Sequence, residues 1–468
     1  MIPMSLAEIA SAVSGRVLHP AHSTMTVTGP VVVDSRRAEA GALFAALPGT
    51  RSDGHDHVAD ALARGALAAL VERPVLPART PPVPAVLVSD VHAALGQLAH
   101  ANRRRLTDCA VVGITGSTGK TTSKDLLAQI LAPHAPTLAN RLSFNNEIGL
   151  PLTVLAADVG TRTLVVEMGA RAPGEIAHLT EIARPHVGVV TNTGTAHLGP
   201  FGGRDAIRRA KAELPTGLPA GGVAVLNADD PATPDMLRAT SATVLTFGTG
   251  HADLRATGIE LDALARPSFS LTWNGRTEPV QLPLTGAHQV LNAAAAGAAA
   301  LALGLSLPRI ARGLSAARRL TPSRMQVERL PDGALVLNDA FNANPDAMLA
   351  AIGTLIDVTP DGGRPIAVLG EMRELGPEAA ELHERTGRAA AEAGARLVIT
   401  VGGADAARIS AGAGRAGADT VHVPDSKTAL AHLGNLAAGD VVLVKGSRAT
   451  GVEEVARRLT AALRGPHG

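Results

Sequence analysis

A glycine-rich segment at Gly113–Thr122 carries the residue types needed to hold a triphosphate. It lies between an apolar run at 109–113 and a helical pattern over 122–131. A glycine-rich turn between a strand and a helix presents backbone N–H groups to phosphate oxygens, Lys120 adds a full charge, and the Thr121 hydroxyl can reach Mg²⁺. The spacing departs from the common phosphate loop, since Ile114 stands where the first glycine is usual. We predict a nucleoside triphosphate site at Thr115, Gly116, Ser117, Thr118, Gly119, Lys120, Thr121 and Thr122.

Two polar residues follow predicted strands of the same region. Glu167 ends the strand predicted over 163–167, and His197 comes shortly after the one over 187–191. Ligands of doubly wound sheets collect at the carboxyl ends of the strands, where a carboxylate and an imidazole could contact Mg²⁺ or a phosphoryl oxygen. The alternatives are a helix-capping or solvated acid and a structural loop histidine.

Four further residues have open interpretations. Lys211 lies in a helical pattern and, on sequence alone, is typical of a surface lysine paired with an acid. His288 and Asn292 are four residues apart on one helix face, which suits a contact to a base edge or an N-terminal cap. Asp339 opens a polar loop after a strand, and this loop could hold a ligand, form a turn before a helix capped at Asn344, or both.

Basic residues also follow strands at two places. Lys445 and Arg448 belong to a Lys-Gly-Ser-Arg turn after the last strong strand, and Ser35 and Arg36 follow a strand near the N-terminus. Either segment could bind an anionic group. The basic run at 103–105 is more typical of a solvated helix end.

The composition excludes several classes of function. The net charge is +1, with 43 basic and 42 acidic residues, so no general field favours nucleic acid or an anionic membrane. The single cysteine excludes an internal disulfide and fits a reducing compartment. The longest apolar stretch, 293–307, predicts a packed alanine-rich helix that is too short to span a bilayer. We expect a cytoplasmic monomer without a signal peptide, membrane insertion or a nucleic-acid partner.

Three domains are predicted, at residues 1–90, 91–320 and 321–468. The first is a small α/β unit in which 58–70 has helical spacing. In the second, apolar strands alternate with helices around the phosphate loop, which predicts a doubly wound, mostly parallel sheet. Residues 253–284 interrupt this rhythm and predict a small antiparallel flap. The third domain alternates again and is Rossmann-like, with no dinucleotide fingerprint after its first strand.

The order of these elements along nearly the whole chain resembles the Mur ligases, the ATP-dependent amide-forming enzymes of peptidoglycan precursor synthesis. The resemblance also covers the Asn-Asn-Glu at 145–147, Arg324 and the uridine-nucleotide segments near residues 34–36 and 53–55. The segments at 341–345 and 370–376 are most similar to the members that join D-alanyl-D-alanine to UDP-N-acetylmuramoyl-tripeptide. That activity proceeds through an acyl phosphate formed from ATP.

The resemblance implies a role for each candidate. ATP phosphates would lie on the loop with Lys120, adenine near His288 and Asn292, and the ribose and phosphates near Arg324 and Asp339. Mg²⁺ would be held by Thr121, Glu167 and His197, and by Lys211 after carbamylation by CO₂. Substrate contacts are implied as follows: Ser35 and Arg36 near the uridine diphosphate; Asn145 and Asn146 near the muramoyl-peptide; Asn342 and Asn344 near the peptide or dipeptide. Lys445 and Arg448 are expected, from their basic turn alone, to bind an anionic part of a substrate.

The chain departs from the family pattern at three positions. Gln289 stands where Asn is usual, Ser323 where Gly is usual, and Phe341 where Tyr is usual. Two alternative functions stay open: a ligase of the same family that adds a single amino acid, and a nucleotide-binding scaffold that has lost catalysis. The persistence of Lys120, Glu167, His197 and Lys211 argues against the scaffold. The third residue of the tripeptide, lysine or diaminopimelate, is not specified by the sequence.

Overall fold

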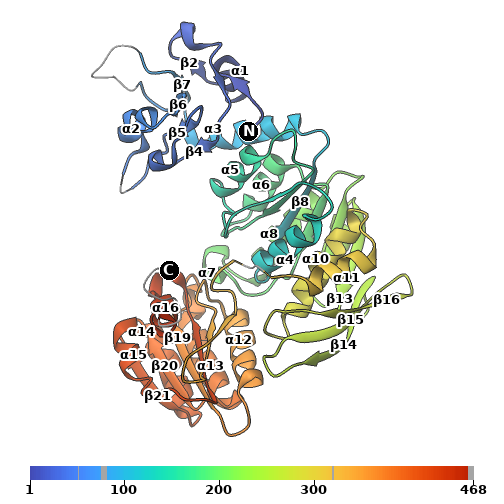
Figure 1. The fold of residues 1–468 in the computed structure, drawn as a ribbon, viewed down its shortest axis with the longest axis vertical. Coiled ribbons are helices and arrows are strands. Elements are labelled where there is room, and N and C mark those ends of the chain that lie inside the picture. The colour runs from blue at the N-terminus through green and yellow to red at the C-terminus, as the bar shows by residue number, and fades with distance from the viewer. Residues whose placement is uncertain (51, 75–81, 319–320, 462–468) are drawn as a thin grey trace.

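The computed structural model describes residues 1–50, 52–74, 82–318 and 321–461. Its N-terminal, central and C-terminal parts follow one another along the long axis of the molecule (Figure 1). The predicted α/β class with a mostly parallel central sheet is confirmed. The domain boundaries after residues 90 and 320 remain a prediction, and Leu320 and residues 462–468 lie outside the described residues. None of the described helices combines the length and apolar character needed to cross a lipid bilayer.

The N-terminal part contains an antiparallel pair and a mixed sheet with the strand order β2-β7-β6-β5-β4. Residues 58–70 do not form one helix: α2 ends at Ala63, and 68–71 become a fully buried strand after the turn at Gly65. The elements are β1 (Met4–Ser5), α1 (Leu6–Ala12), β2 (Arg16–Val17), β3 (Thr26–Val27), β4 (Val31–Val32), β5 (Leu43–Ala45), α2 (Val58–Ala63), β6 (Ala68–Val71) and β7 (Ala85–Leu87).

The central sheet has the strand order β16-β15-β14-β13-β12-β11-β8-β10-β9. Strands β10 and β11 are buried at every residue, as expected for parallel strands with helices on both faces. The strands are β8 (Ala110–Thr115), β9 (Thr137–Ala139), β10 (Thr163–Glu167), β11 (Val187–Val190), β12 (Val223–Asn227), β13 (Thr243–Gly248), β14 (Leu254–Leu261), β15 (Pro267–Trp273) and β16 (Arg276–Gln281).

The antiparallel pairing predicted for 253–284 is confirmed, but these residues do not form a separate flap. Strand β14 pairs in parallel with β13, and β15 and β16 then continue the same sheet in antiparallel fashion. Buried side chains of β14–β16, such as Leu271, pack in one hydrophobic cluster with Leu126 of α4 and the alanines of α10. The segment therefore extends the sheet beneath α10 and α11.

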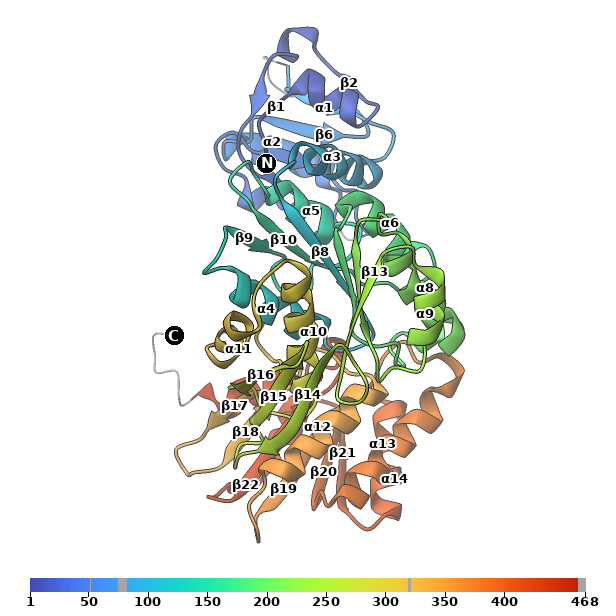
Figure 2. The same cartoon turned by 90° about the vertical axis from the view of Figure 1, so that its right-hand side faces the viewer.

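Helices cover both faces of the central sheet. Figure 2 shows α6 and α8 on one side of the parallel strands, and α4 and α10 on the other. The helices are α3 (Val91–Arg105), α4 (Lys120–Leu131), α5 (Gly149–Ala156), α6 (Glu175–Ala183), α7 (Leu198–Phe201), α8 (Arg204–Thr216), α9 (Thr233–Ala239), α10 (Gln289–Ala302) and α11 (Leu307–Ser315).

The alanine-rich stretch at 293–307 is not one helix. Helix α10 ends at Ala302, because the chain turns through Gly304 at φ +86°, and α11 begins separately with Pro308 in its first turn. Alanines of α10 are almost fully buried. Their small side chains allow α10 to approach α4 closely, which places the start of α10 beside the phosphate loop.

The C-terminal part has the strand order β17-β18-β22-β19-β20-β21, all parallel except β17. Helix α13 begins at Ala379 after a short 3₁₀ turn and ends where Gly394 adopts φ +112°. The elements are β17 (Gln326–Arg329), β18 (Leu335–Asn338), α12 (Pro345–Val358), β19 (Arg364–Gly370), α13 (Ala379–Ala393), β20 (Leu397–Val401), α14 (Ala404–Arg415), β21 (Asp419–Val423), α15 (Ser426–Ala431), β22 (Asp440–Lys445) and α16 (Glu453–Leu459).

Helices α13 and α14 pack through glycine. A Cβ at Gly387 would lie 1.9 Å from the carbonyl oxygen of Ile409, and one at Gly412 would lie 2.1 Å from that of Glu384. Alanine at either position would force the two helices apart.

We expect Gly387→Ala to lower the free energy of unfolding by about 1–3 kcal/mol, because the added methyl group overpacks this crossing. Gly353→Ala in α12 is the matched control, since nothing lies within 4 Å of its Cβ position, and alanine there should stabilise by about 0.5–1 kcal/mol. Urea unfolding of both variants measures the difference. Equal midpoints would contradict this account of the crossing.

Candidate active site

The phosphate loop joins β8 to α4 through two glycines that no other residue could replace without movement. Gly116 has φ +146° and Gly119 has φ +79°, both in the region that favours glycine. A Cβ at Gly116 would lie 1.9 Å from Thr191 Oγ1, and one at Gly119 would lie 2.1 Å from Asn292 Oδ1. The loop is thus pressed between the end of β11 and the first turn of α10.

The residues after β11 fix the shape of this loop. Ser117 N–H donates to the Asn192 carbonyl at 3.0 Å, and Thr118 N–H donates to Asn192 Oδ1 at 3.0 Å. Thr191 Oγ1 donates to the Thr118 carbonyl at 2.6 Å. The N–H groups left to face a phosphate are those of the first turn of α4, which have no acceptor within the helix.

Lys120 folds back over the loop. Its ammonium donates to the Gly116 carbonyl at 2.6 Å and lies 3.4 Å from that of Ser117. Burial lowers the pKa of Lys120, and the Glu167 carboxylate opposes this effect. The two carbonyls therefore hold the Lys120 amino group against the phosphate loop.

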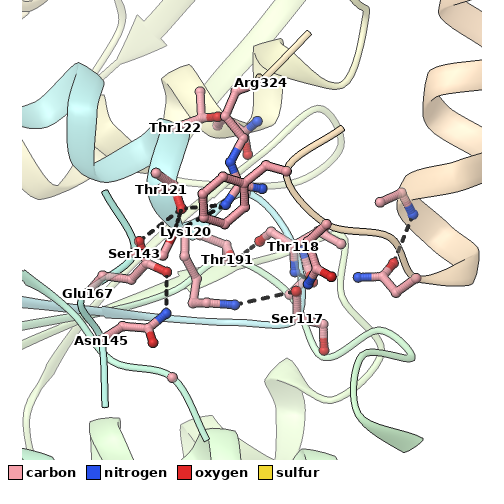
Figure 3. Close-up of a pocket in the computed structure, with 18 of the residues that line it drawn as sticks. Ser117, Thr118, Lys120, Thr121, Thr122, Ser143, Asn145, Glu167, Thr191 and Arg324 are labelled. Carbon is pink, nitrogen blue, oxygen red and sulfur yellow. Dashed lines mark hydrogen bonds between the residues drawn. The ribbon is translucent and has the colours of Figure 1, made fainter. Parts of the chain in front are cut away.

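Glu167 at the end of β10 is 1% exposed and faces the phosphate loop (Figure 3). Its carboxylate accepts a hydrogen bond from Thr121 Oγ1 at 2.9 Å and another from Asn145 Nδ2 at 2.7 Å. Mg²⁺ prefers hydroxyl and carboxylate oxygens. The Thr121 and Glu167 oxygens fit that preference and lie where a phosphate-bound Mg²⁺ would be held.

Arg324 reaches the Thr121 hydroxyl from the C-terminal side of the cavity. Its guanidinium donates to Thr121 Oγ1 at 3.0 Å and stacks on the Phe341 ring, 4.1 Å from the ring centroid. Its Nε is buried without a hydrogen-bond partner among the described residues. Phe341 therefore supplies the ring face that a tyrosine would, without the hydroxyl. Ser323 adopts φ +59°, which explains why glycine suits this position in the family.

Asp339 and Lys445 form an ion pair between the ends of β18 and β22. Lys445 Nζ donates to Asp339 Oδ2 at 2.5 Å and to the Asn342 carbonyl at 3.0 Å. The other Asp339 oxygen accepts from Met325 N–H at 3.1 Å. Both residues line the cavity, and the pair fixes the loop that carries Asn342.

His288 occupies the N-cap position of α10, but its side chain makes no capping hydrogen bond. The capping alternative is therefore wrong for His288, and burial lowers the pKa of its imidazole. Asn292 donates to Gln289 Oε1 at 2.8 Å, so the glutamine that departs from the family pattern orients the Asn292 amide against Gly119.

The loop after β11 also contacts the C-terminal part. His197 Nδ1 is hydrogen-bonded to the Glu374 carboxylate, and both residues have positive φ. Burial lowers the pKa of His197, whereas Glu374 raises it. Asp346 Oδ2 accepts from Thr195 N–H at 2.7 Å and from Thr195 Oγ1 at 2.8 Å. These contacts hold the C-terminal loop elements over the phosphate loop.

Lys211 is not a surface lysine. It is 2% exposed, its ammonium lies 5.7 Å from the Phe201 ring centroid, and no hydrogen bond to it is formed among the described residues. Burial, followed by the nearby charge of Lys120, lowers the pKa of Lys211 to about 7. A large fraction of this amine is therefore neutral at physiological pH.

One cavity of ≈ 850 Å³ gathers most of the predicted residues. Asn344 lines it and also caps α12 through Ala347 N–H at 2.9 Å, so both interpretations of its loop hold. Five predicted residues do not line this cavity: Thr115, Gly116, Lys211, Ser35 and Arg36. The last two lie in the N-terminal part, where Arg36 pairs with Asp34. The predicted residues that line it are Ser117, Thr118, Gly119, Lys120, Thr121, Thr122, Asn145, Asn146, Glu167, His197, His288, Asn292, Arg324, Asp339, Asn342, Asn344, Lys445 and Arg448.

The sequence interpretation missed four residues of this site. Asn192 directly follows β11, so the strand-end rule that found Glu167 could have found it. Ser143, which lies 3.3 Å from both Thr121 Oγ1 and the Arg324 guanidinium, carries no comparable signal. Asp346 and Glu374 act across more than a hundred residues of sequence, which local patterns do not reveal.

The fold and cavity define a nucleotide-binding α/β protein whose phosphate loop is completed by a C-terminal domain. Three family descriptions match successive parts of the chain: "Mur ligase family, catalytic domain" at residues 30–103, "Mur ligase middle domain" at 114–300, and "Mur ligase, glutamate ligase domain" at 323–448. The chain belongs to the Mur ligase family.

Similar proteins narrow the comparison. The UDP-N-acetylmuramoyl-tripeptide–D-alanyl-D-alanine ligase of Mycobacterium tuberculosis (strain H37Rv) is 44% identical, with 98% of each chain covered. The crystal structure of MurF from Acinetobacter baumannii is 34% identical, with a TM-score of 0.88 over 98% of this chain and 99% of that one. MurF ligase from Thermotoga maritima in complex with ADP is 30% identical, with a TM-score of 0.81 over 93% and 98%.

Lys211 gives a pH-dependent prediction for stability. Because its pKa is about 7 in the folded chain and 10.5 for an unperturbed lysine, the unfolded chain binds more protons between these values. The Lys211 contribution to the free energy of unfolding should therefore rise with pH from about 7 to 10.5, at up to about 1.4 kcal/mol per pH unit. Below pH 7 the burial penalty is fully present.

The measurement compares the wild type with Lys211→Met by urea unfolding in CO₂-free buffer between pH 6 and 10. Met removes the buried charge, so this variant should be the more stable at pH 6 and lose most of that advantage by pH 10. A pH-independent difference would contradict the lowered pKa.

Proposed function

We propose that this chain is an ATP-dependent ligase that joins D-alanyl-D-alanine to UDP-N-acetylmuramoyl-tripeptide, giving the pentapeptide, ADP and phosphate. This is activity class 6.3.2.10. Support comes from relatives of that name that match over nearly the full chain, and from a solved relative that holds ADP. The proposed placement of this reaction is the cavity between the central and C-terminal parts.

The observation that carries the proposal is the arrangement around Thr121. Its hydroxyl lies between the Glu167 carboxylate, which fits Mg²⁺, and the Arg324 guanidinium, which fits a phosphate oxygen. Arg324 comes from beyond the central sheet, so nucleotide binding and the placement of the C-terminal part support each other. A protein that only bound nucleotide would not need a second cation, Arg324, from the C-terminal part.

We propose the following reaction. The terminal carboxylate of the tripeptide attacks the γ-phosphorus of ATP, the bond to the bridging oxygen breaks, and ADP leaves. The amine of D-alanyl-D-alanine then attacks the acyl phosphate carbon, loses a proton, and phosphate departs as the amide forms. Lys120 and Arg324 offset the negative charge that moves during transfer, and the N–H groups of α4 orient the phosphates. Mg²⁺ bound at Thr121 and Glu167 would add further charge neutralisation.

We also propose that Lys211 is carbamylated by CO₂. A neutral amine attacks CO₂, loses a proton, and becomes an anionic carbamate whose oxygens could serve a second Mg²⁺. The pKa of about 7 leaves a large fraction of the amine neutral at physiological pH. The nearby Lys120 cation favours an anionic product, whereas the Glu213, Glu175 and Glu167 carboxylates favour the ammonium. We further propose that His197, held by Glu374, serves the metal region, and that Ser35 and Arg36 contact the uridine nucleotide.

The substrate assignment predicts a strict requirement for three reactants. ADP release should need ATP, UDP-N-acetylmuramoyl-tripeptide and D-alanyl-D-alanine together, and should stay at background when the dipeptide is replaced by D-alanine, L-lysine or diaminopimelate. A coupled assay measures ADP release with each acceptor, and mass spectrometry identifies the nucleotide product. Turnover with a single amino acid alone would favour the alternative ligase, and no turnover with any acceptor would favour the scaffold.

The carbamate predicts that Lys211→Ala lowers kcat by at least about 10³-fold, since one metal-holding anion is lost. Bicarbonate should not restore this variant. In ¹³C-bicarbonate the wild type should show a carbamate carbon signal that is absent from Lys211→Ala. Lys124→Ala is the control, because Lys124 is also buried but already donates to two carbonyls and pairs with Asp125. Full activity of Lys211→Ala would overturn the role.

A further inference from the structure

A second cavity of ≈ 670 Å³ lies between α3, α6 and α8, and it shares no lining residue with the nucleotide cavity. It is at the opposite end of the central sheet, because His186, which lines it, directly precedes β11 and bonds to the start of β8. Figure 2 shows the three helices around this end of the strands. Its lining includes two residues of the basic run at 103–105.

The sequence context of Arg103 predicts a solvated helix-end residue, and this prediction is wrong for Arg103. It is 8% exposed, and its guanidinium donates to the carbonyls of Ala183 at 2.9 Å, Leu106 at 3.0 Å and Arg184 at 3.4 Å. These bonds tie the end of α3 to the end of α6 and fix the orientation of the guanidinium. Since the group has five N–H donors, two remain for other acceptors.

His186 adds a donor at the same point. Its Nδ1 accepts the Val111 N–H at 3.0 Å, so in the neutral ring the proton is on Nε2. Nε2 lies 3.5 Å from Arg103 Nη2. Two donors that approach this closely cannot bond to each other, and an acceptor that bridges them would satisfy both. Burial and the neighbouring Arg103 and Arg184 lower the pKa of His186, which favours the neutral ring.

The remaining lining suits a ligand with an anionic head and an apolar body. Arg104 and Arg184 add positive charge, while Glu181 and Glu213 also line the cavity. The Glu213 carboxylate is already bonded to the N–H groups of Gly174 at 2.7 Å and Ala177 at 2.9 Å. Apolar surface comes from Leu106, Leu218 and Pro219.

We propose that this cavity binds a small phosphorylated molecule, with its phosphate between Arg103 and His186 and its apolar portion against Leu218 and Pro219. Several donors from separate elements suit a dianion with three terminal oxygens better than a carboxylate with two. The cavity is also larger than inorganic phosphate needs, which favours a phosphate ester over the free ion. This site is independent of the proposed ligase activity.

The test titrates the protein with phenyl phosphate, inorganic phosphate and benzoate, without nucleotide or substrates. Side-chain nitrogen signals of ¹⁵N-histidine-labelled protein report the site, with His186 assigned from the variant below. We expect saturable shifts at His186 that are tightest for phenyl phosphate and weakest for benzoate. Shifts confined to His197 and His288 would place the probe in the nucleotide cavity and overturn the proposal, as would benzoate binding as tightly as phenyl phosphate.

Two variants and a control connect binding to these residues. His186→Asn keeps an acceptor for Val111 N–H but removes the Nε2 donor, and should weaken phenyl phosphate binding by at least about tenfold, measured by calorimetry. Arg184→Gly removes a charge at a position with φ +45°, where glycine fits, and should weaken binding severalfold. Arg105→Ala, exposed and outside the lining, should bind like the wild type. Equal affinities in all variants would overturn the site.

Discussion

The structure depends on one backbone constraint, the close approach of the phosphate loop to two other elements. For the first turn of α4 to present free N–H groups, the chain must turn through Gly116 and Gly119 at positive φ while touching Thr191 and Asn292. The order of the central strands follows from this, because β11 must lie beside β8 to deliver Thr191. The alanine surface of α10 follows as well, since a larger surface would lift Asn292 away from Gly119.

A second consequence is that the site belongs to no single domain. The Thr121 hydroxyl bonds Glu167 of the central sheet and Arg324 from the C-terminal side. Two further contacts, Thr195 with Asp346 and His197 with Glu374, hold the same domains together. Both start from the segment after β11, whose Asn192 also bonds the phosphate loop. An error in domain placement would therefore disturb directly the residues that we propose as metal and phosphate ligands. Such coupling suits a reaction with three substrates, because the acyl phosphate must be kept from water until the amine arrives.

The sequence indicated the positions of residues correctly where the cause is local. The glycine-rich loop lies between a strand and a helix, Glu167 ends the neighbouring strand, and Asn344 caps α12, and each of these follows from a few consecutive residues. Prediction from sequence failed where the cause is long-range. His197 and Glu374 are 177 residues apart, and nothing near His197 indicates its partner. The helical spacing of 58–70 and the alanine run at 293–307 were overridden by turns at Gly65 and Gly304, where the change of direction mattered more than the periodicity.

Lys211 and Lys124 differ in the partners of their ammonium groups and not in their burial. Lys124 lies equally deep in the same domain, but its ammonium has two carbonyl partners and the Asp125 carboxylate, which offset the loss of water. Lys211 has an aromatic ring near it and another cation, Lys120, as its main charged neighbour. A lysine selected for stability would not be placed there, since burial without a partner only destabilises the charged form. Such a position favours an amine that carries no proton, and the nearby Lys120 cation would stabilise an anion formed there.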